Sequence, residues 1–528
     1  WNFGDTGGFD PALNVLSDWN NRNVAYGPHV AHVFETPGVY TVEVTAVDSD
    51  GPPVTASVTI TVQDPATAYA GSRTILVDPS GQGDGAAYPG AQVFTTVSAA
   101  VNAFEALGQS GRILLKRGET YSSVNVDISP AMTNFRMGTW GTGAKPVLTP
   151  VPIDDAAANS TREIFQVLNA SPVADFVLYD LDMRGAWDAE TETGDPREEP
   201  LYWLTHTGAA SPLYCVHGCD FSGFSKVKFG NISHPGRLTC IFNKVSVTNW
   251  QDYGLFGHGP IFGSGNKRLA IVGSSLRQSV HACQGPLDGG KDGFSNDHGP
   301  FRTSGWDKVH IDACSFYSTN GWSGGPAGRT AAQACIRVNT EGEIGAEWFV
   351  SRVACEGGFV MIDADAASSS RPDNPWNFVI DKALLVGTAQ TTNQIVLGSS
   401  GTTLRNIIGI MPNVAYESGI SEFVTYLTDN PQKNVLNEPV RLHNCTFLNL
   451  DDADDMAMVA GGQIWNDYTE VNNVFHAPDQ PGAVTGQGPI DTAAPSGFSA
   501  VYPGRRISTQ KVRVTPGGTV GTGGTVTS

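Results

Sequence analysis

The chain has 528 residues, of which 16% are charged and 61 are glycine, and its formal net charge is −20. This length suits one large domain with a small one, and the few charged residues disfavour long surface helices and favour short strands joined by turns. The negative charge argues against nucleic acid and anionic membrane as partners, and no apolar run is long enough for membrane insertion.

Residues 1–64 are predicted to form a small N-terminal module. After the Pro37-Gly38 turn the sequence alternates over Val39–Val47, and a second alternating run, VTASVTITV, follows a DSDG turn. Such alternation indicates paired strands. The turn aspartates Asp48 and Asp50 suit either a calcium site or a plain turn.

The same module carries a family resemblance. The phrase WNFGD at Trp1–Asp5, followed by HVFETPGVYTV from His32, resembles the PKD-type immunoglobulin-like domain. The resemblance implies a β-sandwich spacer or adhesion module outside the cell or on a surface assembly. The two strands that usually precede the Trp in that family are missing, so we expect a piece of a longer protein.

Residues 65–505 are predicted to form a solenoid. After a short linker come a strand at Thr74–Val77, an amphipathic helix near 97–107 and a strand at Arg112–Lys116. This order resembles the opening of right-handed parallel β-helix proteins of the pectate-lyase-like superfamily, in which a short helix caps the first coil. The resemblance implies an all-β, right-handed parallel β-helix after the partial sandwich module.

The cysteines indicate a repeat. Three phrases are near-copies, HGCDF around Cys219, DACSF around Cys314 and HNCTF around Cys445. Cys219 and Cys240 are 21 residues apart, and Cys335 and Cys355 are 20 apart, so we expect one coil in about 20 residues. The absence of a CxxC spacing favours buried free thiols over disulfides or metal, with Cys314, Cys335 and Cys355 close together in the core.

Strand phrases recur from residue 123 to about 500, with long interruptions at 186–212, 284–308 and 412–440. In a solenoid, insertions of this size are expected as loops on one face, often the working face. Residues 506–528 end in a Gly/Thr-rich run that predicts a linker or tail.

The candidate site is the segment 250–308, which is dense in polar and aromatic residues. The phrase Gly-His-Gly-Pro at His258 is matched by Asp-His-Gly-Pro at His298, 40 residues later. If that distance is about two coils, the two imidazoles lie near one another along one face. The charged residues between or beside them are Asp252, Asp288, Lys291, Asp292 and Arg302.

Two enzymatic chemistries fit these residue types. Glycoside hydrolysis needs a pair of carboxylates, which the four aspartates Asp252, Asp288, Asp292 and Asp297 could supply. The Gly257–Gly259 phrase resembles one motif of the polygalacturonase-like hydrolases, although their Asp-Asp and Asn-x-Asp phrases are absent. Uronate β-elimination needs a base and a cation, for which Lys291, Arg302, His258 and His298 are candidates, with Asp288 and Asp292 on a calcium ion.

Each of these residues also has a structural interpretation. Gly-His-Gly-Pro and the DGGKDG run are common turn sequences. The aromatics, expected to be exposed for stacking against sugar rings, are Trp250, Tyr253, Trp306 and Trp322, and tryptophan also plugs solenoid cores.

The leading functional hypothesis is a polysaccharide-recognising protein that binds, and in one version cleaves, an acidic glycan as a lyase or glycoside hydrolase. The alternative is a non-enzymatic virion tail or head spike, or a surface adhesin, that binds host glycan. Unpaired core cysteines suit a protein that folds in a reducing cytoplasm, as phage parts do. We expect an extracellular, cell-surface or virion location, with a homotrimer or larger surface assembly as the oligomeric alternative to a single chain.

Overall fold

The computed structural model describes part of the chain, and its described residues form two compact units. The first unit holds the described residues of Trp1–Arg277 and Lys308–Ser315, and the second holds Gln278 and the described residues of Lys291–Asp307 and Phe316–Ser528. The described ranges are 1–9, 19–47, 51–129, 131–132, 134–152, 162–167, 175–188, 194, 198–203, 213–229, 238–250, 253–258, 267–278, 299–304, 306–318, 334–339, 347–357, 359–363, 377–387, 393–397, 402–411, 421–426, 440–449, 456–460, 468–471 and 473–476.

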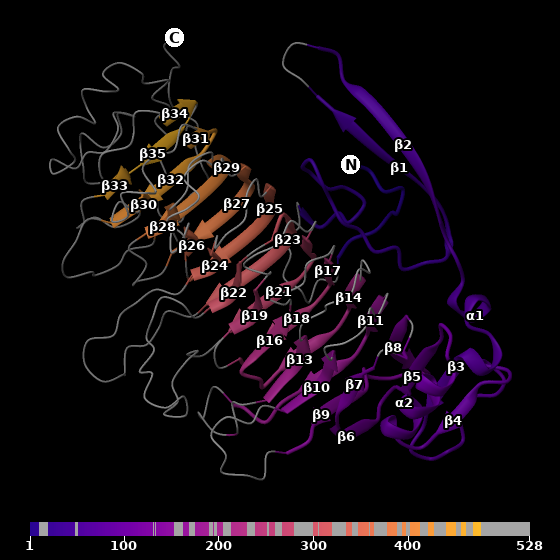
Figure 1. Ribbon diagram of the computed structural model, residues 1–528. Coiled ribbons are helices and arrows are strands. Elements are labelled where there is room, and N and C mark those ends of the chain that lie inside the picture. Colours follow the sequence, from indigo (N-terminus) through magenta and orange to yellow (C-terminus); the bar gives the residue numbers. More distant parts are fainter. Residues whose placement is uncertain are drawn as a thin grey trace. The chain divides into compact units, whose positions relative to one another are not determined.

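In the first unit, three ladders of parallel strands make the sides of a solenoid (Figure 1). The longest ladder contains β3 (Thr74–Val77), β5 (Arg112–Lys116), β8 (Phe135–Trp140), β11 (Asp175–Tyr179), β14 (Leu213–His217), β17 (Leu238–Asn243), β20 (Lys267–Val272) and the start of β23 (Lys308–Ser318). The second contains β6 (Thr120–Val124), β9 (Val147–Pro150), β12 (Asp182–Arg184), β15 (Asp220–Ser222), β18 (Ser246–Thr248) and β21 (Ser275–Gln278). The third contains β7 (Val126–Ile128), β10 (Arg162–Val167), β13 (Glu198–Trp203), β16 (Lys226–Phe229) and β19 (Tyr253–His258).

The second unit is also built of parallel strands, which form two faces among its described residues. One face contains β25 (Glu347–Glu356), β27 (Asn377–Val386), β29 (Thr402–Met411), β31 (Val440–His443), β32 (Thr446–Asn449), β34 (Tyr468–Val471) and β35 (Val474–His476). The other contains β22 (Gly299–Ser304), β24 (Ala334–Asn339), β26 (Phe359–Asp363), β28 (Asn393–Leu397), β30 (Ser421–Tyr426) and β33 (Met456–Ala460). The predicted all-β class with a parallel β-helix is therefore confirmed.

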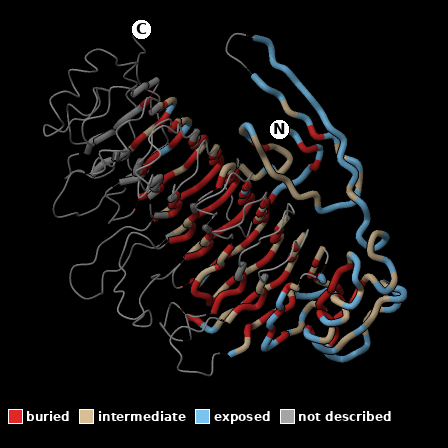
Figure 2. Tube along the Cα trace, in the orientation of Figure 1, coloured by how far each residue is buried: buried red, intermediate tan, exposed pale blue. Residues whose placement is uncertain are grey.

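The parallel register places side chains of the same kind above one another in successive coils. Phe176 of β11 pairs with Phe135 on one side and with Tyr214 on the other, and its ring centroid lies 5.8 Å and 5.9 Å from theirs. In the second unit, Trp348 pairs with Phe378 at 5.7 Å. Figure 2 shows buried residues following the strands. Burying such rings in a continuous inner column is the main apolar contribution to a solenoid.

From β11 to β23, a left-handed turn residue joins the first ladder to the second. In the first unit the positive φ values, 63°, 61°, 55°, 56° and 54°, belong to Asp180, Gly218, Lys244, Gly273 and Ala313. The second unit has the same feature at Arg352, Lys382, Asn406 and Asn444. The residue that follows each one is buried: Leu181, Cys219, Val245, Ser274, Cys314, Val353, Ala383, Ile407 and Cys445.

The three cysteine phrases occupy this turn, so their equivalence is confirmed, but the predicted period near 20 is wrong. Val177 pairs with Cys215, Cys215 with Ile241 and Ile241 with Ala270, so successive coils take 38, 26 and 29 residues. A three-sided coil needs three strands and their connections, which is more than 20 residues can supply here. Cys219 lies at the turn and Cys240 lies inside β17, so their 21-residue spacing does not measure one coil.

The interruptions predicted as loops also contain strands of the solenoid. Residues 186–212 include β13, 284–308 include β22, and 412–440 include β30. These strands were missed because the alternation in each is short and is followed by polar sequence.

The cysteines are buried and free as predicted. This holds for seven of them, Cys215, Cys219, Cys240, Cys314, Cys335, Cys355 and Cys445, and Cys283 lies outside the described residues. In the second unit, Cys335 Sγ lies 3.6 Å from the carbonyl oxygen of Glu356, the residue after Cys355. Cys314 belongs to the first unit, and its expected closeness to the other two stays a prediction.

The helix α2 (Val97–Ala106) begins the solenoid and agrees with the helix predicted near 97–107. Thr96 caps it by accepting a hydrogen bond from the Ala99 amide, and Val97, Ala100, Val101 and Phe104 form its buried face. Phe104 meets Phe135 edge-on at 5.3 Å, so the helix covers the first coil. The short helix α1 (Pro65–Ala68), a 3-10 turn at Gly71–Arg73 and β4 (Gln92–Phe94) precede it.

The N-terminal residues form an antiparallel hairpin and a small core. The strands β1 (Gly38–Ala46) and β2 (Val54–Val62) pair along their full length and are largely exposed (Figure 2). Phe3, Ala25 and Val42 make a buried cluster, and Trp1 and Phe34 pack on it. Whether this is a PKD-type sandwich stays a prediction. Among the described residues, no helix combines the length and apolar character needed to cross a bilayer.

Candidate functional site

Most of the predicted site falls outside the described residues. Asp252, Asp288, Lys291, Asp292, His298 and Trp322 lie there, and so does the side chain of His258. His258 ends β19, where the neighbouring Gly257 leaves no room for a Cβ beside the ring of Phe229. Arg302 is half-buried in β22, in register with Arg337 of β24. Their proposed convergence at one site stays a prediction.

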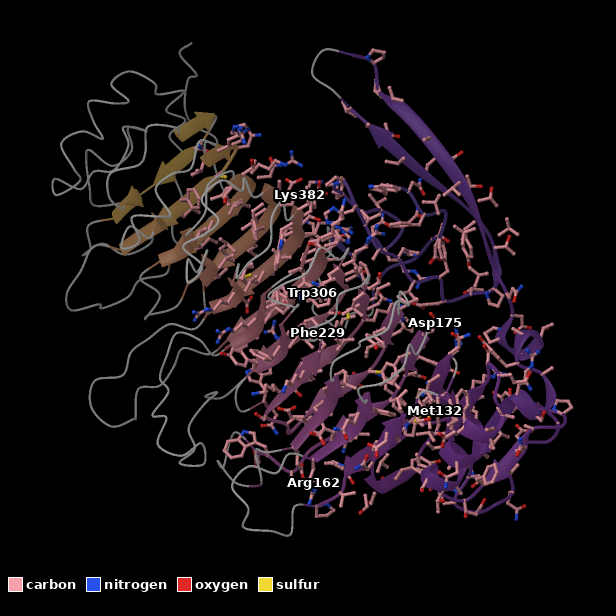
Figure 3. The ribbon with its side chains drawn as sticks, viewed as in Figure 1. Met132, Arg162, Asp175, Phe229, Trp306 and Lys382 are labelled. Carbon is pink, nitrogen blue, oxygen red and sulfur yellow. The ribbon has the colours of Figure 1, made fainter. Side chains whose placement is uncertain are left out.

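The exposure predicted for three aromatic residues is wrong. Trp250, Tyr253 and Trp306 are only 1%, 4% and 1% exposed, so their rings are core residues and offer no face to a sugar (Figure 3 labels Trp306). Large aromatic side chains bury much apolar area, so core packing accounts for these three residues.

A cavity of about 1060 Å³ lies in the first unit, between the N-terminal residues and the outer face of the solenoid. We call it the first-unit cavity. None of the described residues predicted as a site lines it. Its walls include Phe34, Glu35, Tyr69, Tyr88, Arg112, Arg136, Thr139, Lys145, Val177, Tyr179, Asp180, Cys215, His217, Asp220 and Lys244.

The strand pattern places the floor of this cavity. In β11 the side chains of Phe176 and Leu178 point inward, so Val177 and Tyr179 face outward on the opposite side of the pleat. Tyr179 pairs in register with His217 of the next coil. Gly138 of β8 lies directly under the Tyr179 ring, where a Cβ would collide with it. The sequence signal for this floor is an outward-facing tyrosine at the end of β11, at a position where polar residues are usual.

One end of the first-unit cavity is a cluster of tyrosine and arginine side chains. The Arg112 guanidinium carbon lies 5.6 Å from the Tyr88 ring centroid and 5.9 Å from that of Tyr69. The Arg136 guanidinium carbon lies 5.4 Å from the Tyr69 ring. Burial raises the pKa of the Tyr179 hydroxyl to about 12, although the charge of Arg112 acts in the opposite direction, so Tyr179 is a neutral donor and acceptor at physiological pH.

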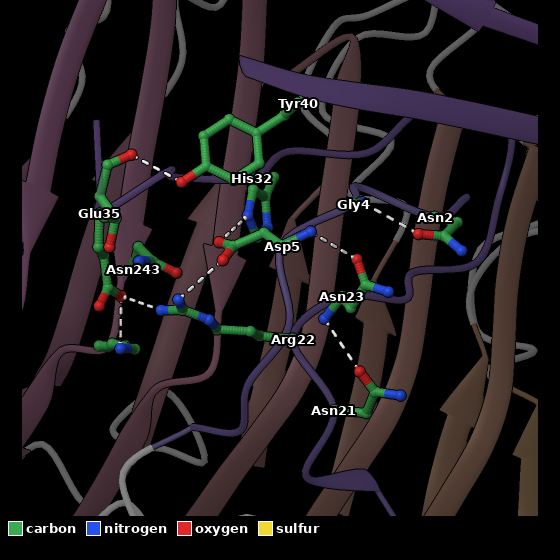
Figure 4. Close-up of polar contacts among 12 residues, drawn as sticks. Asn2, Gly4, Asp5, Asn21, Arg22, Asn23, His32, Glu35, Tyr40 and Asn243 are labelled. Atoms are coloured by element: carbon green, nitrogen blue, oxygen red, sulfur yellow. Dashed lines mark hydrogen bonds and ion pairs between the residues drawn. The ribbon is translucent and has the colours of Figure 1, made fainter. Parts of the chain in front are cut away.

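The other end is an ion-pair cluster centred on Glu35. Its carboxylate pairs with Lys244 and, at 2.8 Å, with Arg22 (Figure 4). Burial opposes ionisation of Glu35, but the hydrogen bonds and charges of Lys244 and Arg22 outweigh it and lower the pKa of the carboxyl. Burial lowers the pKa of His217 to about 4, which keeps that imidazole neutral.

The aspartates of the cavity floor are also paired with cations. Asp180 Oδ2 accepts a hydrogen bond from Thr139 at 2.8 Å and pairs with Arg117, and Asp220 pairs with Lys145 at 2.7 Å. Each carboxylate therefore has a cation beside it. Such groups accept hydrogen bonds from hydroxyls, and the tyrosine rings offer faces for stacking.

The roof of the cavity is held to the solenoid by side chains of the N-terminal residues. Phe9 is buried against Ala270, Val272 and Ala313, and its ring covers Gly273. His29 Nε2 lies 2.9 Å from the Val309 carbonyl oxygen. These contacts fix the segment that carries Phe34 and Glu35.

The WNFGD phrase supports this roof. Asp5 is 5% exposed and pairs with Arg22 at 3.0 Å and with His32 at 2.9 Å (Figure 4). The Phe3 ring stacks on His32 with centroids 4.2 Å apart. Gly4 has φ of 67°, and a Cβ there would meet the Thr41 carbonyl oxygen at 2.9 Å. The motif residues thus hold Arg22 where it contacts Glu35.

Within the described residues, no group of three or more His, Cys, Asp or Glu side chains is arranged to hold a metal ion. The calcium ligands predicted at Asp288 and Asp292, and the alternative at Asp48 and Asp50, lie outside those residues.

No family model matches the sequence, and no curated protein matches it. Solved structures similar to this chain include the catalytic domain of a GH87 alpha-1,3-glucanase in complex with nigerose, at TM-score 0.40 and 11% identity over 72% of this chain. The same catalytic domain with tetrasaccharides gives 0.41 and 10% over 72%. Tailspike protein 3 of bacteriophage CBA120 gives 0.26 and 12% over 83%. The chain spans 63%, 67% and 66% of these structures.

Proposed function

We propose that this protein recognises a polysaccharide and that the first-unit cavity is its binding site. The observation that carries the proposal is the lining of that cavity, in which Tyr69, Tyr88 and Tyr179 stand beside ionised carboxylates and cations. Sugars bind proteins through this combination, because a ring face stacks on aromatic carbons while hydroxyls need charged or polar hydrogen-bonding partners. The volume fits an oligosaccharide of a few residues.

Binding is better supported at this cavity than cleavage. Hydrolysis requires one carboxyl held protonated near neutral pH, whereas the pKa of Glu35 is lowered and Asp180 and Asp220 each have a cation beside them. A lyase or hydrolase centre built from His258, His298, Asp252, Asp288, Lys291, Asp292 and Arg302 is a separate proposal, supported by the sequence of the 250–308 segment.

A virion spike or surface adhesin is the second candidate function. The seven described cysteines are buried and unpaired, which favours folding in a reducing cytoplasm before assembly over secretion through an oxidising compartment. A PKD-type N-terminal module, an extracellular or virion location and a homotrimeric assembly are part of this proposal. Such a protein would hold its glycan without degrading it.

The test is equilibrium binding of the whole protein to a panel of neutral and acidic polysaccharides, with release of reducing ends and of unsaturated uronate measured in parallel. Tyr88→Ala removes one ring from the cavity, and we expect it to weaken binding about tenfold. Tyr26→Ala is the matched control, since Tyr26 is exposed and outside the cavity. Failure of every polysaccharide to bind, or an equal loss in both variants, refutes the proposal.

A further inference from the structure

Arg112 is a buried cation at the wall of the first-unit cavity. It begins β5, is 7% exposed, and pairs in register with Thr74 of β3. Among the described residues no carboxylate lies within 4.0 Å of its guanidinium, whereas the neighbouring Arg136 pairs with Asp175 at 3.0 Å (Figure 3 labels Asp175). A guanidinium withdrawn from water without a counter-charge is costly, so such groups occur where an anion binds.

The contacts of Arg112 fix its orientation. Its Nε donates to Thr74 Oγ1 at 3.0 Å, and that hydroxyl donates in turn to the Tyr69 carbonyl oxygen at 2.6 Å. The two tyrosine rings, Tyr69 and Tyr88, flank the guanidinium at 5.9 Å and 5.6 Å. Arg112 also makes a side-chain hydrogen bond with Tyr179, so with Nε engaged the remaining Nη hydrogens are the donors left for a ligand. A carboxylate matches their spacing with two parallel hydrogen bonds.

We propose that Arg112 is the carboxylate-binding group of a subsite for an acidic sugar residue, a uronate, whose ring packs beside Tyr69 or Tyr88. This inference rests on the proposed polysaccharide-binding function and adds the substrate class. A neutral sugar would leave the guanidinium without its counter-charge, so the cavity should discriminate strongly between the acid and a neutral derivative.

The first experiment uses the unaltered protein. Its affinity is measured for a uronic-acid oligosaccharide, for the methyl ester of the same oligosaccharide, and for a sulfated neutral oligosaccharide of equal length. We expect the free acid to bind at least about tenfold more tightly than the ester. Equal binding of acid and ester overturns the Arg112 inference and leaves the proposed function standing. Absence of binding by all three overturns both.

The second experiment assigns the preference to Arg112. Arg112→Gln should remove the acid-over-ester preference while the ester binds as before, and Arg112→Lys should keep part of it because the charge remains without the bidentate geometry. Arg184→Gln is the matched control, because it changes the charge equally at an exposed residue paired with Asp182 at 2.6 Å, outside the cavity. Loss of the preference in the control too, or Arg112-dependent binding of the sulfated sugar as tight as that of the acid, overturns the assignment.

Binding of the methyl ester also shows whether each Arg112 variant is still folded. A variant that still binds the ester has kept its cavity. If both Arg112 variants lose the ester together with the acid while the control retains both, Arg112 is a structural residue and the inference is overturned.

Discussion

At the scale of single residues, the position after each left-handed turn residue explains the cysteine phrases. Cys219, Cys314 and Cys445 each place Sγ 3.2–3.5 Å from the carbonyl oxygen two residues earlier. Ser274 occupies the same position, and its hydroxyl donates to the Val272 carbonyl at 3.0 Å. In these four coils the position holds a small buried donor, whereas in the other coils an apolar side chain such as Leu181 or Val245 fills it. Burial raises the pKa of Cys219 to about 12, so its thiol keeps the proton that this hydrogen bond needs.

His217 predicts a loss of stability in acid. Burial and the hydrogen bond from Asn243 Nδ2, at 2.8 Å, favour the neutral imidazole, whose pKa is lowered to about 4. Between pH 6.5 and 4, His217 is protonated in the unfolded chain but not in the folded chain. The free energy of unfolding therefore falls as the pH falls through that window. The cost approaches about 3 kcal/mol at the acid end.

The measurement is the unfolding midpoint of the unaltered protein and of His217→Gln, at pH 7.5 and at pH 4.5. We expect the acid-induced drop to be smaller in the variant, which has no proton to take up at this position. The difference at pH 7.5 gives the pH-independent cost of the substitution. An identical drop in both proteins would contradict the pKa assigned to His217.

At the scale of elements, the left-handed turn residues fix the junction between two ladders, and two glycines there differ in their surroundings. Gly218 has φ of 61° and its nearest neighbour to a Cβ is 3.9 Å away, whereas Gly273 has φ of 56° and a Cβ there would enter the ring of Phe9. Gly218→Ala should cost about 1 kcal/mol of backbone strain alone.

Gly273→Ala should cost more than Gly218→Ala, because it also displaces Phe9 and with it the roof of the cavity. Chemical denaturation gives the stabilities, and limited proteolysis of the N-terminal residues reports on the roof. We expect faster cleavage for Gly273→Ala only; polysaccharide binding does not separate the two variants, because Gly218 itself lines the cavity. Equal cleavage rates in the two variants would show that Phe9 does not hold the N-terminal residues.

Individual strands were predictable from the sequence where a single local pattern determines them. The strands at Thr74–Val77 and Arg112–Lys116 match the predicted bounds, because a short apolar run between turn residues leaves few alternatives. The number of residues in a coil was not predictable, because it depends on which strands pair. The similar spacings between cysteines were misleading, because they joined cysteines at turns to cysteines inside strands. The cavity was missed because Glu35, Arg112 and His217 are far apart in sequence and meet only when the N-terminal residues fold back on the solenoid.

At the scale of the whole molecule, the buried thiols give a prediction that spans both units. Because Cys215, Cys219, Cys240, Cys314, Cys335, Cys355 and Cys445 are buried and free, a thiol reagent should label almost none of these seven in the native protein and all of them after denaturation without reductant. Labelling is counted by mass spectrometry. Finding several of the seven as disulfides in freshly purified protein would contradict both the core packing and the inferred reducing site of folding.

The left-handed turn recurs at the same place in successive coils, but the number of residues in a coil varies widely. Ala270 and its partner His310 are 40 residues apart, while Phe378 and its partner Thr402 are 24 apart, yet both pairs keep parallel register. The registered strands thus tolerate large differences in the chain that connects them. Evolution can therefore lengthen, shorten or replace these connections without altering the buried column, so the surface of such a fold can change while its core is conserved.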